Sequence, residues 1–465
     1  MQKFNNAYIL GISLVSAMGG LLFGYDWVVI GGAKPFYESF FEITSSAGLQ
    51  AWAMSCALIG CIIGAVFSGV ISERFGRKWP LTLSAFLFTI ASIGTGSAFS
   101  YTTFVIFRII GGVGIGIASA ISPMYIAEVA PARMRGRFVA LNQMTLVIGI
   151  LAAQVINFLI ADKVPAGASS VFIQHSWNGQ MGWRWMFFAC SIPAIIFFLL
   201  TFTVPESPRW LLKAGKSDKA FPTLSKIGGE EYARKEIVNI RSTFNDINEK
   251  VDFKALLHPG YRFVLLLGVF LAVFQQWCGI NTVFNYAEEI FSAAGYGVSD
   301  TLFNIVITGS VNLVFTLLAM FTVDKLGRKK LMLLGSIGLA LTYILLGGAF
   351  WFHLKGIAVL TFVVIAIAIY AMSLAPIVWV ILSEIFPNRI RGAAMALATF
   401  ALWIACFILT YTFPLLNKSL GAAPTFWIYA LICLFGFFFI LLKLPETKGK
   451  TLESIEKEIT ESKNK

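Results

Sequence analysis

Charge is scarce in this chain. Asp, Glu, Lys and Arg make up 13% of its 465 residues, about half the share that a soluble domain carries. Histidine occurs three times and never in the middle of a long apolar run, which argues against a buried histidine relay. The six cysteines all lie in apolar segments, where packing is a more common role than a disulfide or a metal site.

Motifs of nucleotide, metal and covalent chemistry are also missing from the sequence. The glycine runs GCIIG (60–64) and GGVGIG (111–116) lie inside apolar runs, where we expect close helix packing and no nucleotide binding. We see no P-loop, metal-ligand cluster or nucleophile–base arrangement. These absences argue against an enzyme, an ATP-driven pump and a bound cofactor.

Long hydrophobic runs dominate instead. Hydrophobic residues make up 57% of the chain and the mean hydropathy is +0.78. Since about 20 apolar residues span a bilayer as a helix, we expect an all-α membrane protein with twelve spans. The expected spans are 8–33, 50–72, 79–100, 102–125, 138–161, 184–204, 261–293, 301–323, 330–352, 356–382, 393–415 and 424–443. Spans 8–33 and 261–293 are longer than a bilayer requires, so they should be tilted or broken. The first run is too long for a cleaved signal, lacks a cleavage site and is followed by more spans.

Basic residues gather in every second loop between these spans. They are Arg74, Arg77, Lys78, Arg133, Arg135, Arg137, Lys325, Arg328, Lys329, Lys330, Arg389 and Arg391. The other loops carry scattered lysines only, Lys34 among them. By the positive-inside rule, the basic loops and both termini face the cytoplasm. The net charge of +12 therefore reflects membrane topology and does not indicate nucleic-acid binding.

The two halves of the chain repeat three motifs in the same order. GVISERFGRK (69–78) matches MFTVDKLGRK (320–329), AEVAPARMRG (127–136) matches SEIFPNRIRG (383–392), and PESPR (205–209) matches PETKG (445–449). This duplication predicts two six-helix bundles with a substrate site between them near the membrane midplane. We expect an N-terminal bundle at 1–204, cytoplasmic linker helices at 205–260, a C-terminal bundle at 261–443 and a cytoplasmic tail at 444–465.

The repeated motifs also place acids and bases at the cytoplasmic ends of helices. Ion pairs there can close the inner side of the protein and break when it opens, or they can only fix topology and helix ends. We expect a gating network, in which Arg135→Ala or Glu384→Ala slows transport while ligand still binds. Its candidate members are Glu73, Arg77, Glu128, Arg135, Glu206, Arg209, Asp324, Arg328, Glu384 and Arg391.

Only two charges lie in the middle of a span, Asp26 and Arg108, while Glu288 and Glu289 lie toward the outer end of the seventh span. A charge at the bilayer centre costs about 2.5–3.5 kcal/mol, so Asp26 and Arg108 should pair. The pair can simply lock two helices. A buried carboxylate can also carry a proton, because burial favours its neutral form and the guanidinium favours its charged form. We favour the proton role.

Amides and aromatic side chains form a second set. The amides are Asn142, Gln143, Gln275, Gln276, Asn281 and Asn312, and Gly279 should loosen the seventh span between them. Amides inside a membrane can bond neighbouring helices, but they also suit a neutral polyhydroxylated ligand, since each donates and accepts. Phe23, Trp379 and Trp403 can stack on a sugar ring; Phe23 lies one helical turn before Asp26, and Trp379 follows Pro376.

At these residues the sequence resembles the sugar porters of the major facilitator superfamily, and among them the bacterial D-xylose–proton symporters. The resemblance covers nearly the whole chain. It is carried by GGLLFGYD, RFGRK, RIIGGVGIG, SPMYIAEVAPARMRG, PESPRWL, FQQWCGIN, VDKLGRK, LSEIFPNRIRG and PETKGKTLE.

The resemblance implies a role for each set of residues. Asp26 is implied as the proton-coupling carboxylate and Arg108 as its partner. The implied sugar contacts are Gln143, Gln275, Gln276, Asn281 and Trp379, with Phe23, Asn312 and Trp403 nearby. The implied cytoplasmic charge network contains Arg77, Glu128, Arg135, Glu206, Arg328, Glu384 and Arg391.

The chain departs from the xylose symporters at several sugar-facing positions. Ile150 replaces a glutamine and Phe284 a leucine, and both replacements resemble the animal glucose facilitators. The other departures are Asn285 for a tyrosine, Ala375 for a glycine, Leu402 for a glutamine and Cys406 for an asparagine. These changes remove hydrogen-bonding groups from one side of the implied pocket, so a glucose-type hexose becomes as plausible a substrate as xylose.

The sequence thus predicts proton-coupled import of a monosaccharide through the lipid bilayer. A uniporter without proton coupling is the first alternative, and a sugar-sensing receptor is a weaker one because the segment after PETKG is short. We expect a bacterial cytoplasmic membrane as the location. A monomer suffices, since one chain encloses the expected pathway.

Overall fold

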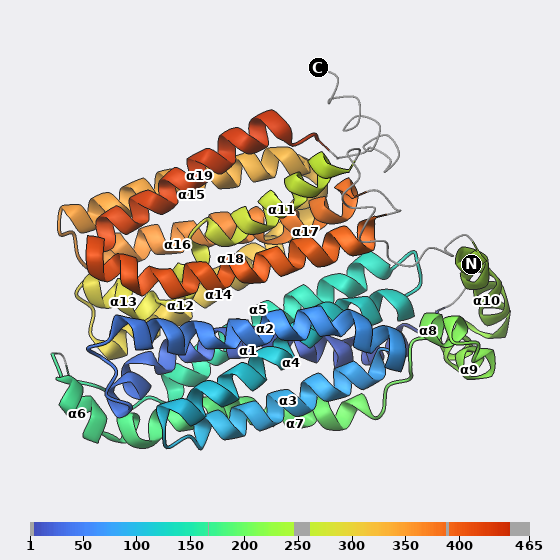
Figure 1. Ribbon diagram of the computed structural model, residues 1–465, viewed down its shortest axis with the longest axis horizontal. Helices are drawn as coiled ribbons and strands as arrows, with labels where there is room; N and C mark the ends of the chain where they lie inside the picture. The colour runs from blue at the N-terminus through green and yellow to red at the C-terminus, as the bar shows by residue number, and fades with distance from the viewer. Residues whose placement is uncertain (1–3, 166, 246–260, 387–389, 447–465) are drawn as a thin grey trace. The chain divides into compact units, whose positions relative to one another are not determined.

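The fold is all-helical. A computed structural model describes residues 4–165, 167–245, 261–386 and 390–446, and no strand occurs among them (Figure 1). The long helices are α1 (Asn6–Phe40), α2 (Ala47–Phe75), α3 (Lys78–Gly96), α4 (Tyr101–Val129), α5 (Arg135–Ile160), α7 (Trp183–Thr201), α11 (Arg262–Trp277), α14 (Val298–Leu326), α15 (Arg328–Trp351), α16 (Ile357–Met372), α18 (Arg391–Leu420) and α19 (Ala422–Lys443). The short elements are α6 (Ser170–His175), the π-helix η1 (Asn178–Gly182), α8 (Pro208–Lys213), α9 (Ser217–Gly228), α10 (Glu230–Asn245), α12 (Ile280–Asn285), α13 (Ala287–Ala293) and α17 (Leu374–Ile385).

Within the described residues, twelve helical segments are long and apolar enough to cross a membrane. The predicted all-α fold with twelve spans is therefore confirmed. The first span is one unbroken helix, α1, which continues through Pro35 to Phe40. The prediction that Lys34 belongs to a loop is therefore wrong, because the Gly-Gly pair and the proline around it resemble a turn but lie inside the helix.

The seventh span is broken, as its length predicted. Helix α11 ends at Trp277, and Gly279 begins the next helix, α12, with φ +87°. A side chain is disfavoured in this left-handed region. A Cβ at Gly279 would also lie 2.9 Å from Cγ of Tyr429, so the site requires glycine on two grounds.

The tenth span is broken as well, between α16 and α17. Ser373 separates the two helices with φ −125° and ψ −89°. Pro376 lies in the first turn of α17, where its missing N–H removes no intrahelical hydrogen bond. The break therefore lies three residues before Pro376, the proline of this span.

The described residues divide into two compact units. The first unit falls within Met1–Val29, Ile59–Ala153 and Arg184–Lys250, and the second within Ile30–Leu58, Gln154–Trp183 and Val251–Lys465. Helices α1, α2 and α5 each contribute residues to both units.

Small residues bring α2 and α4 close together in the first unit. A Cβ at Gly60 would lie 2.1 Å from the carbonyl oxygen of Ile109, and one at Gly64 would lie 2.3 Å from that of Val113. The same holds for Gly116 against Cys61, at 2.3 Å. The predicted helix-packing role of these glycines is confirmed.

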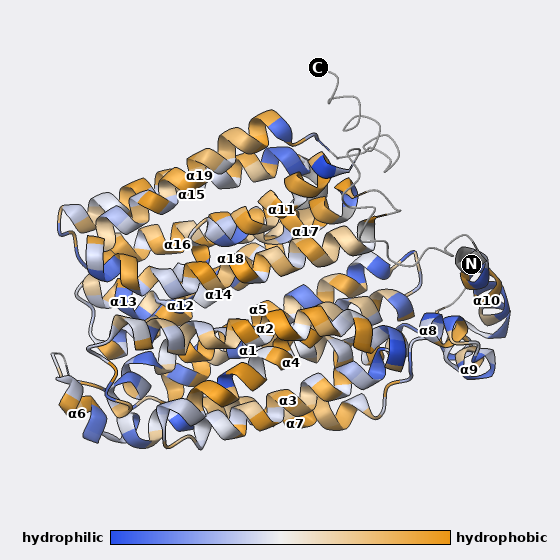
Figure 2. Ribbon diagram, in the orientation of Figure 1, coloured by the Kyte–Doolittle hydropathy of each residue, from blue (hydrophilic) through white to orange (hydrophobic). Residues whose placement is uncertain are grey.

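Helices α8, α9 and α10 follow the sixth span, where the sequence predicted short linker helices. Figure 2 shows many hydrophilic residues on α9 and α10, in contrast to the long apolar helices. Leu211, Leu212 and Ala220 form a small core beneath them, against which Trp210, Ile237 and Ile240 pack. The remainder of the predicted linker, 246–260, and residues 447–465 of the predicted tail lie outside the described residues.

Candidate functional site

The first unit contains a buried ion pair between α1 and α4. The Nη1 of Arg108 donates to Oδ1 of Asp26 at 2.7 Å, and the two residues are 3% and 6% exposed. The predicted contact between these residues is confirmed. The second carboxylate oxygen of Asp26, Oδ2, is buried and has no hydrogen-bond partner among the described residues. Arg108 therefore holds one oxygen of this carboxylate and leaves the other without a partner among the described residues.

Neighbouring side chains hold the arginine in place. The guanidinium of Arg108 lies over the ring of Phe187, with Cζ 5.7 Å from the ring centroid. Phe187 in turn packs edge-to-face with Phe104, one turn before Arg108 on α4. Gly111, three residues after Arg108, has no side chain, and a Cβ there would lie 4.0 Å from Oδ1 of Asp26. The pair is thus enclosed by aromatic and small residues, which strengthens its electrostatic attraction.

The second unit contains the amides of α11 and α12. The Nε2 of Gln275 donates to the carbonyl oxygens of Leu374 and Ala375, both at 3.1 Å, next to the break between α16 and α17. Its Oε1 is buried without a hydrogen-bond partner. Asn285 has an unpartnered, buried Oδ1 as well. A buried acceptor without a hydrogen-bond partner costs free energy. The hydroxyl groups of a neutral ligand could donate hydrogen bonds to these two oxygens and remove that cost.

Gln276 and Asn281 bond to one another across the Gly279 break. Nδ2 of Asn281 donates to Oε1 of Gln276 and lies 3.7 Å from Sγ of Cys406 on α18. Both amides are 8% exposed. The structure thus brings the FQQWCGIN amides together, and it gives them partners in the protein as well.

The two tryptophans of the predicted set differ in access. Trp379 on α17 is 38% exposed, whereas Trp403 on α18 is 4% exposed. Part of the Trp379 side chain is therefore accessible, while Trp403 packs inside the unit. Of the other predicted contacts, Phe284 and Asn312 are buried in the second unit, Ile150 is buried in the first unit, and Phe23 and Gln143 are half-buried there.

The three motifs of the first repeat meet at one end of the first unit. Arg77 forms a two-pronged pair with Glu128, in which Nε and Nη2 donate at 2.9 and 2.8 Å. Glu206 accepts hydrogen bonds from the backbone N–H groups of Arg77 and Lys78, at 2.8 and 3.2 Å, and so caps the start of α3. Gly76 precedes this start with φ +90°, and a Cβ on it would lie 2.1 Å from Oε2 of Glu206.

The second repeat builds the same arrangement in the second unit. Nη2 of Arg328 donates to Oε1 of Glu384 at 3.2 Å. Glu446 accepts from the N–H groups of Arg328 and Lys329 at 3.0 and 3.2 Å, which caps α15 after Gly327. Even the lysine contacts correspond: Nζ of Lys78 donates to Phe202 O at 2.8 Å, and Nζ of Lys329 to Leu441 O at 2.9 Å.

Other predicted members of the network lie apart from these contacts. The side chain of Glu73 is 63% exposed and lies 3.8 Å from Nζ of Lys213. Arg209 is half-buried on α8, and Arg135 is exposed at the start of α5. Burial raises the pKa of Tyr232 on α10 to about 12, against the nearby charge of Arg135, which lowers it. The side chains of Asp324 and Arg391 lie outside what the structure describes.

Two charged residues on α1, Lys34 and Glu38, form a buried pair that was not among the predicted site residues. They are 2% and 4% exposed, and Nζ of Lys34 lies 3.2 Å from Oε1 of Glu38. The signal was their spacing of four residues, which places them on one helix face once the helix is extended beyond Pro35. Arg184 was also missed: it is 5% exposed and donates to the carbonyl oxygens of Gly96 and Ala98 at the end of α3.

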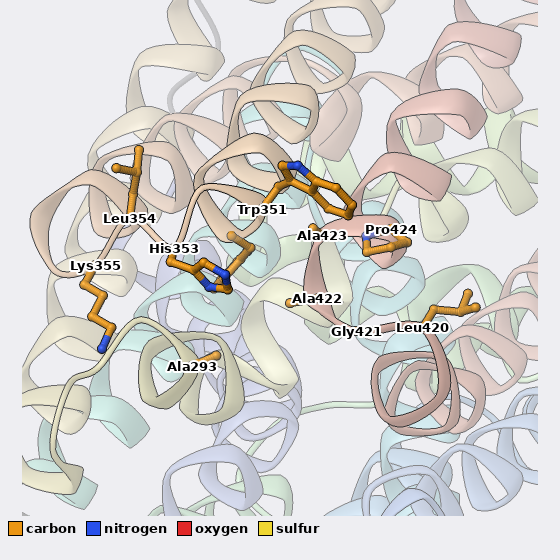
Figure 3. Close-up of a pocket in the computed structure, with 11 residues that line it drawn as sticks. Ala293, Trp351, His353, Leu354, Lys355, Leu420, Gly421, Ala422, Ala423 and Pro424 are labelled. Carbon is orange, nitrogen blue, oxygen red and sulfur yellow. The ribbon is translucent and has the colours of Figure 1, made fainter.

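A pocket in the second unit lies away from all of these residues. Figure 3 shows His353, Lys355 and Trp351 around it, near the end of α15 and the start of α19. None of the predicted contacts lines this pocket, so its position does not bear on them.

Comparison with known proteins places the chain in a family. The model of the family described as "Sugar (and other) transporter" matches residues 12–459. The D-xylose-proton symporter of Escherichia coli is 40% identical, with 98% of this chain and 96% of the relative covered. The glucose facilitated diffusion protein of Zymomonas mobilis is 34% identical, with 98% of each chain covered. A solved structure of the E. coli xylose transporter XylE in a partially occluded inward open conformation matches with a TM-score of 0.84 and 38% identity, covering 96% of this chain and all of that one.

The chain therefore belongs to the family of sugar (and other) transporters. Its all-helical, twelve-span architecture is that of the xylose transporter, and it is a membrane protein.

Proposed function

We propose that this protein is a proton-coupled monosaccharide symporter that works by alternating access. One observation carries the proposal: the buried carboxylate of Asp26 is held by Arg108 through a single oxygen, and its other oxygen has no partner. Such a group can accept a proton from one side of the membrane and lose it to the other, provided that its surroundings change between the two conformations. The name of the E. coli relative, a D-xylose-proton symporter, supports this assignment.

The proposed substrate is a sugar of the D-xylose or D-glucose class. In the second unit, Gln275 and Asn285 offer unpartnered acceptors and Trp379 offers an accessible aromatic face. The set proposed to contact the sugar is Phe23, Gln143, Ile150, Gln275, Gln276, Asn281, Phe284, Asn285, Asn312, Trp379 and Trp403. Because no carboxylate or cation occurs among them, the set suits a neutral ligand.

The repeated charge motifs are proposed to act as gates. Arg77 with Glu128, and Arg328 with Glu384, form ion pairs between helix ends that can separate when the cytoplasmic side opens. Glu384→Ala breaks one of these pairs and should slow transport without abolishing sugar binding. We propose the same outcome for Arg135→Ala, as a residue of the repeated motif that lies outside the two pairs.

A uniporter is the second candidate. Ile150 and Phe284 resemble the animal glucose facilitators, and the Z. mobilis relative is named a facilitated diffusion protein. In a uniporter the pair of Asp26 and Arg108 would only fix α1 against α4. A sugar-sensing receptor is the weakest of the three candidates, because no observation favours it.

The proposed setting is a bacterial cytoplasmic membrane, with both termini in the cytoplasm and a monomer as the working unit. We also propose the domain limits 1–204, 205–260, 261–443 and 444–465 as the units of function.

The decisive experiment measures proton movement driven by sugar. Purified protein in liposomes receives D-xylose, D-glucose and other monosaccharides in turn while the external pH is recorded, with Asp26→Asn in parallel. Symport makes the outside more alkaline when sugar is added, and Asp26→Asn loses this signal but still exchanges sugar. One charge crossing 100 mV provides about 2.3 kcal/mol, which supports roughly 40-fold accumulation. Equal sugar uptake without a pH change in both proteins would establish the uniporter.

A further inference from the structure

A cluster of four charges joins α1 to α13 inside the second unit. Nζ of Lys34 lies 2.8 Å from Oε1 of Glu289, 3.5 Å from Oε2 of Glu288 and 3.2 Å from Oε1 of Glu38. The Lys34 and Glu38 side chains are 3% and 5% exposed, and those of Glu288 and Glu289 are 18% and 19% exposed. Burial of this order is rare for lysine unless the ammonium is paired.

The cluster lies at the end of the second unit opposite the Arg328–Glu384 pair. Helix α14 begins directly after α13 and ends just before Arg328, and its 29 residues span about 43 Å at 1.5 Å each. The cluster is therefore remote from the cytoplasmic charge motifs, and neither the repeats nor the sugar contacts include it.

The same face of α1 touches the sugar-binding segment directly. Gly31 lies one turn before Lys34, and a Cβ on it would lie 3.1 Å from Asn285 O and 3.5 Å from Phe284 O. One face of α1 thus meets the backbone of α12 at Gly31 and the carboxylates of α13 at Lys34. Since α12 is only six residues long and begins at the Gly279 break, its own hydrogen bonds do little to fix its place.

We propose that Lys34 is a positioning residue for sugar binding: by pairing with Glu288 and Glu289 it holds α12, and with it Asn281 and Asn285, against α1. This inference rests on the proposed function, because it assumes that the two amides contact the sugar. It assigns a role in substrate affinity to a charge that touches no substrate.

The cluster contains more acid than base. One ammonium faces three carboxylates, and full ionisation would leave two uncompensated negative charges in a buried place. The other polar groups around it are the phenols of Tyr37 and Tyr286 and the amide of Gln50, whose Nε2 donates to Oε2 of Glu38 at 3.1 Å. Without the ammonium, the carboxylates repel one another when ionised and are relieved when protonated, so a variant lacking Lys34 should be most impaired at high pH.

The test compares sugar affinity in four purified proteins by titration calorimetry with D-xylose and D-glucose. Lys34→Met should raise the dissociation constant about tenfold or more at neutral pH, and Lys34→Arg should restore affinity to within about threefold. The ratio of the Lys34→Met value to the wild-type value should fall as the pH is lowered. Lys163→Met, which removes an exposed lysine of the same unit, is the matched control and should change nothing.

A second variant guards against loss of folding. Lys34→Met/Glu289→Gln removes one charge of each sign, so it should fold while binding sugar as weakly as Lys34→Met, with a smaller dependence on pH. Repeating the titrations on an Asp26→Asn background removes the proposed coupling site from the pH profile. Unchanged affinity in Lys34→Met or in the folded double variant overturns the positioning role alone. Absence of binding by the wild-type protein to every sugar overturns the proposed function and this inference together.

Discussion

Gly76 is a position where the structure predicts that a small substitution is damaging for two separate reasons. It has φ +90°, and the carboxylate of Glu206 occupies the space that a side chain would need. That carboxylate caps α3 by accepting hydrogen bonds from the N–H groups of Arg77 and Lys78. Gly76→Ala therefore imposes backbone strain and displaces a helix cap at the same time.

The loss of unfolding free energy in Gly76→Ala is the sum of the backbone strain and the lost helix cap. A non-glycine residue in the left-handed region costs about 1–2 kcal/mol. A Cβ 2.1 Å from Oε2 of Glu206 forces the carboxylate away, and each hydrogen bond that it accepts as a charged group is worth about 1.5–3 kcal/mol. Loss of both bonds brings the total for Gly76→Ala to roughly 4–8 kcal/mol.

Three comparisons separate the contributions. Gly215 has φ +73° with nothing within 4 Å of its Cβ position, so Gly215→Ala should cost only the strain of about 1–2 kcal/mol. Gly327 has φ +93° and the Glu446 oxygen at 2.9 Å, so Gly327→Ala should fall between the two. In a Glu206→Ala background the cap is already gone, and Gly76→Ala should then cost no more than Gly215→Ala.

Thermal unfolding in detergent, followed by tryptophan fluorescence, measures the order. The drop in Tm should be largest for Gly76→Ala, intermediate for Gly327→Ala and smallest for Gly215→Ala. An equal drop for Gly76→Ala with and without Glu206 would refute the reasoning, because the clash with the cap would then contribute nothing.

Three further predictions follow from the site. Trp379→Ala should weaken sugar binding about tenfold with little change in Tm, which titration calorimetry measures. The buried Trp403→Ala should lower the free energy of unfolding by about 3–5 kcal/mol, as is typical of a core tryptophan, and so should lower Tm clearly in an unfolding experiment. Gln275→Met removes two hydrogen bonds to carbonyl groups at the start of α17 and should raise the KM of sugar exchange; an unchanged KM contradicts it. Arg77→Lys breaks the two-pronged pair with Glu128, so it should slow transport while the sugar dissociation constant stays the same.

The sequence predicted the features that repeat along the chain and those that avoid a large free-energy cost inside a membrane. Twelve apolar runs give twelve spans because backbone polar groups in a membrane must be satisfied within helices. The contact of Asp26 with Arg108 was predictable since two isolated charges at membrane depth need each other. The break at Gly279 was predictable from an overlong run with a glycine between amides.

Other features depend on three-dimensional neighbours. Lys34 stands between a glycine pair and a proline, which is a local pattern typical of turns. Its ion pair with Glu289 of α13, a residue far away in the sequence, stabilises it inside α1 instead. The break at Ser373 contains neither glycine nor proline, the strongest sequence signals of a helix break. The different exposure of Trp379 and Trp403 likewise depends on packing against other helices, which the local sequence around each tryptophan does not indicate.

The repeats also clarify which charges can serve as gates. Glu206 and Glu446 accept hydrogen bonds from backbone N–H groups at the start of α3 and α15, so each has a helix-capping role in its own unit, as the simpler interpretation of these motifs held. Glu128 and Glu384 instead accept from arginine side chains, which can separate without unwinding a helix. We therefore propose that opening, if these motifs act as gates, separates the arginine–glutamate pairs, while the capping glutamates keep the helix ends intact. Because both units share this division, the capping and pairing geometry is repeated, whereas the polar groups of the long helices differ: α1 and α4 of the first unit hold the Asp26–Arg108 pair, and α11 and α12 of the second unit hold neutral amides.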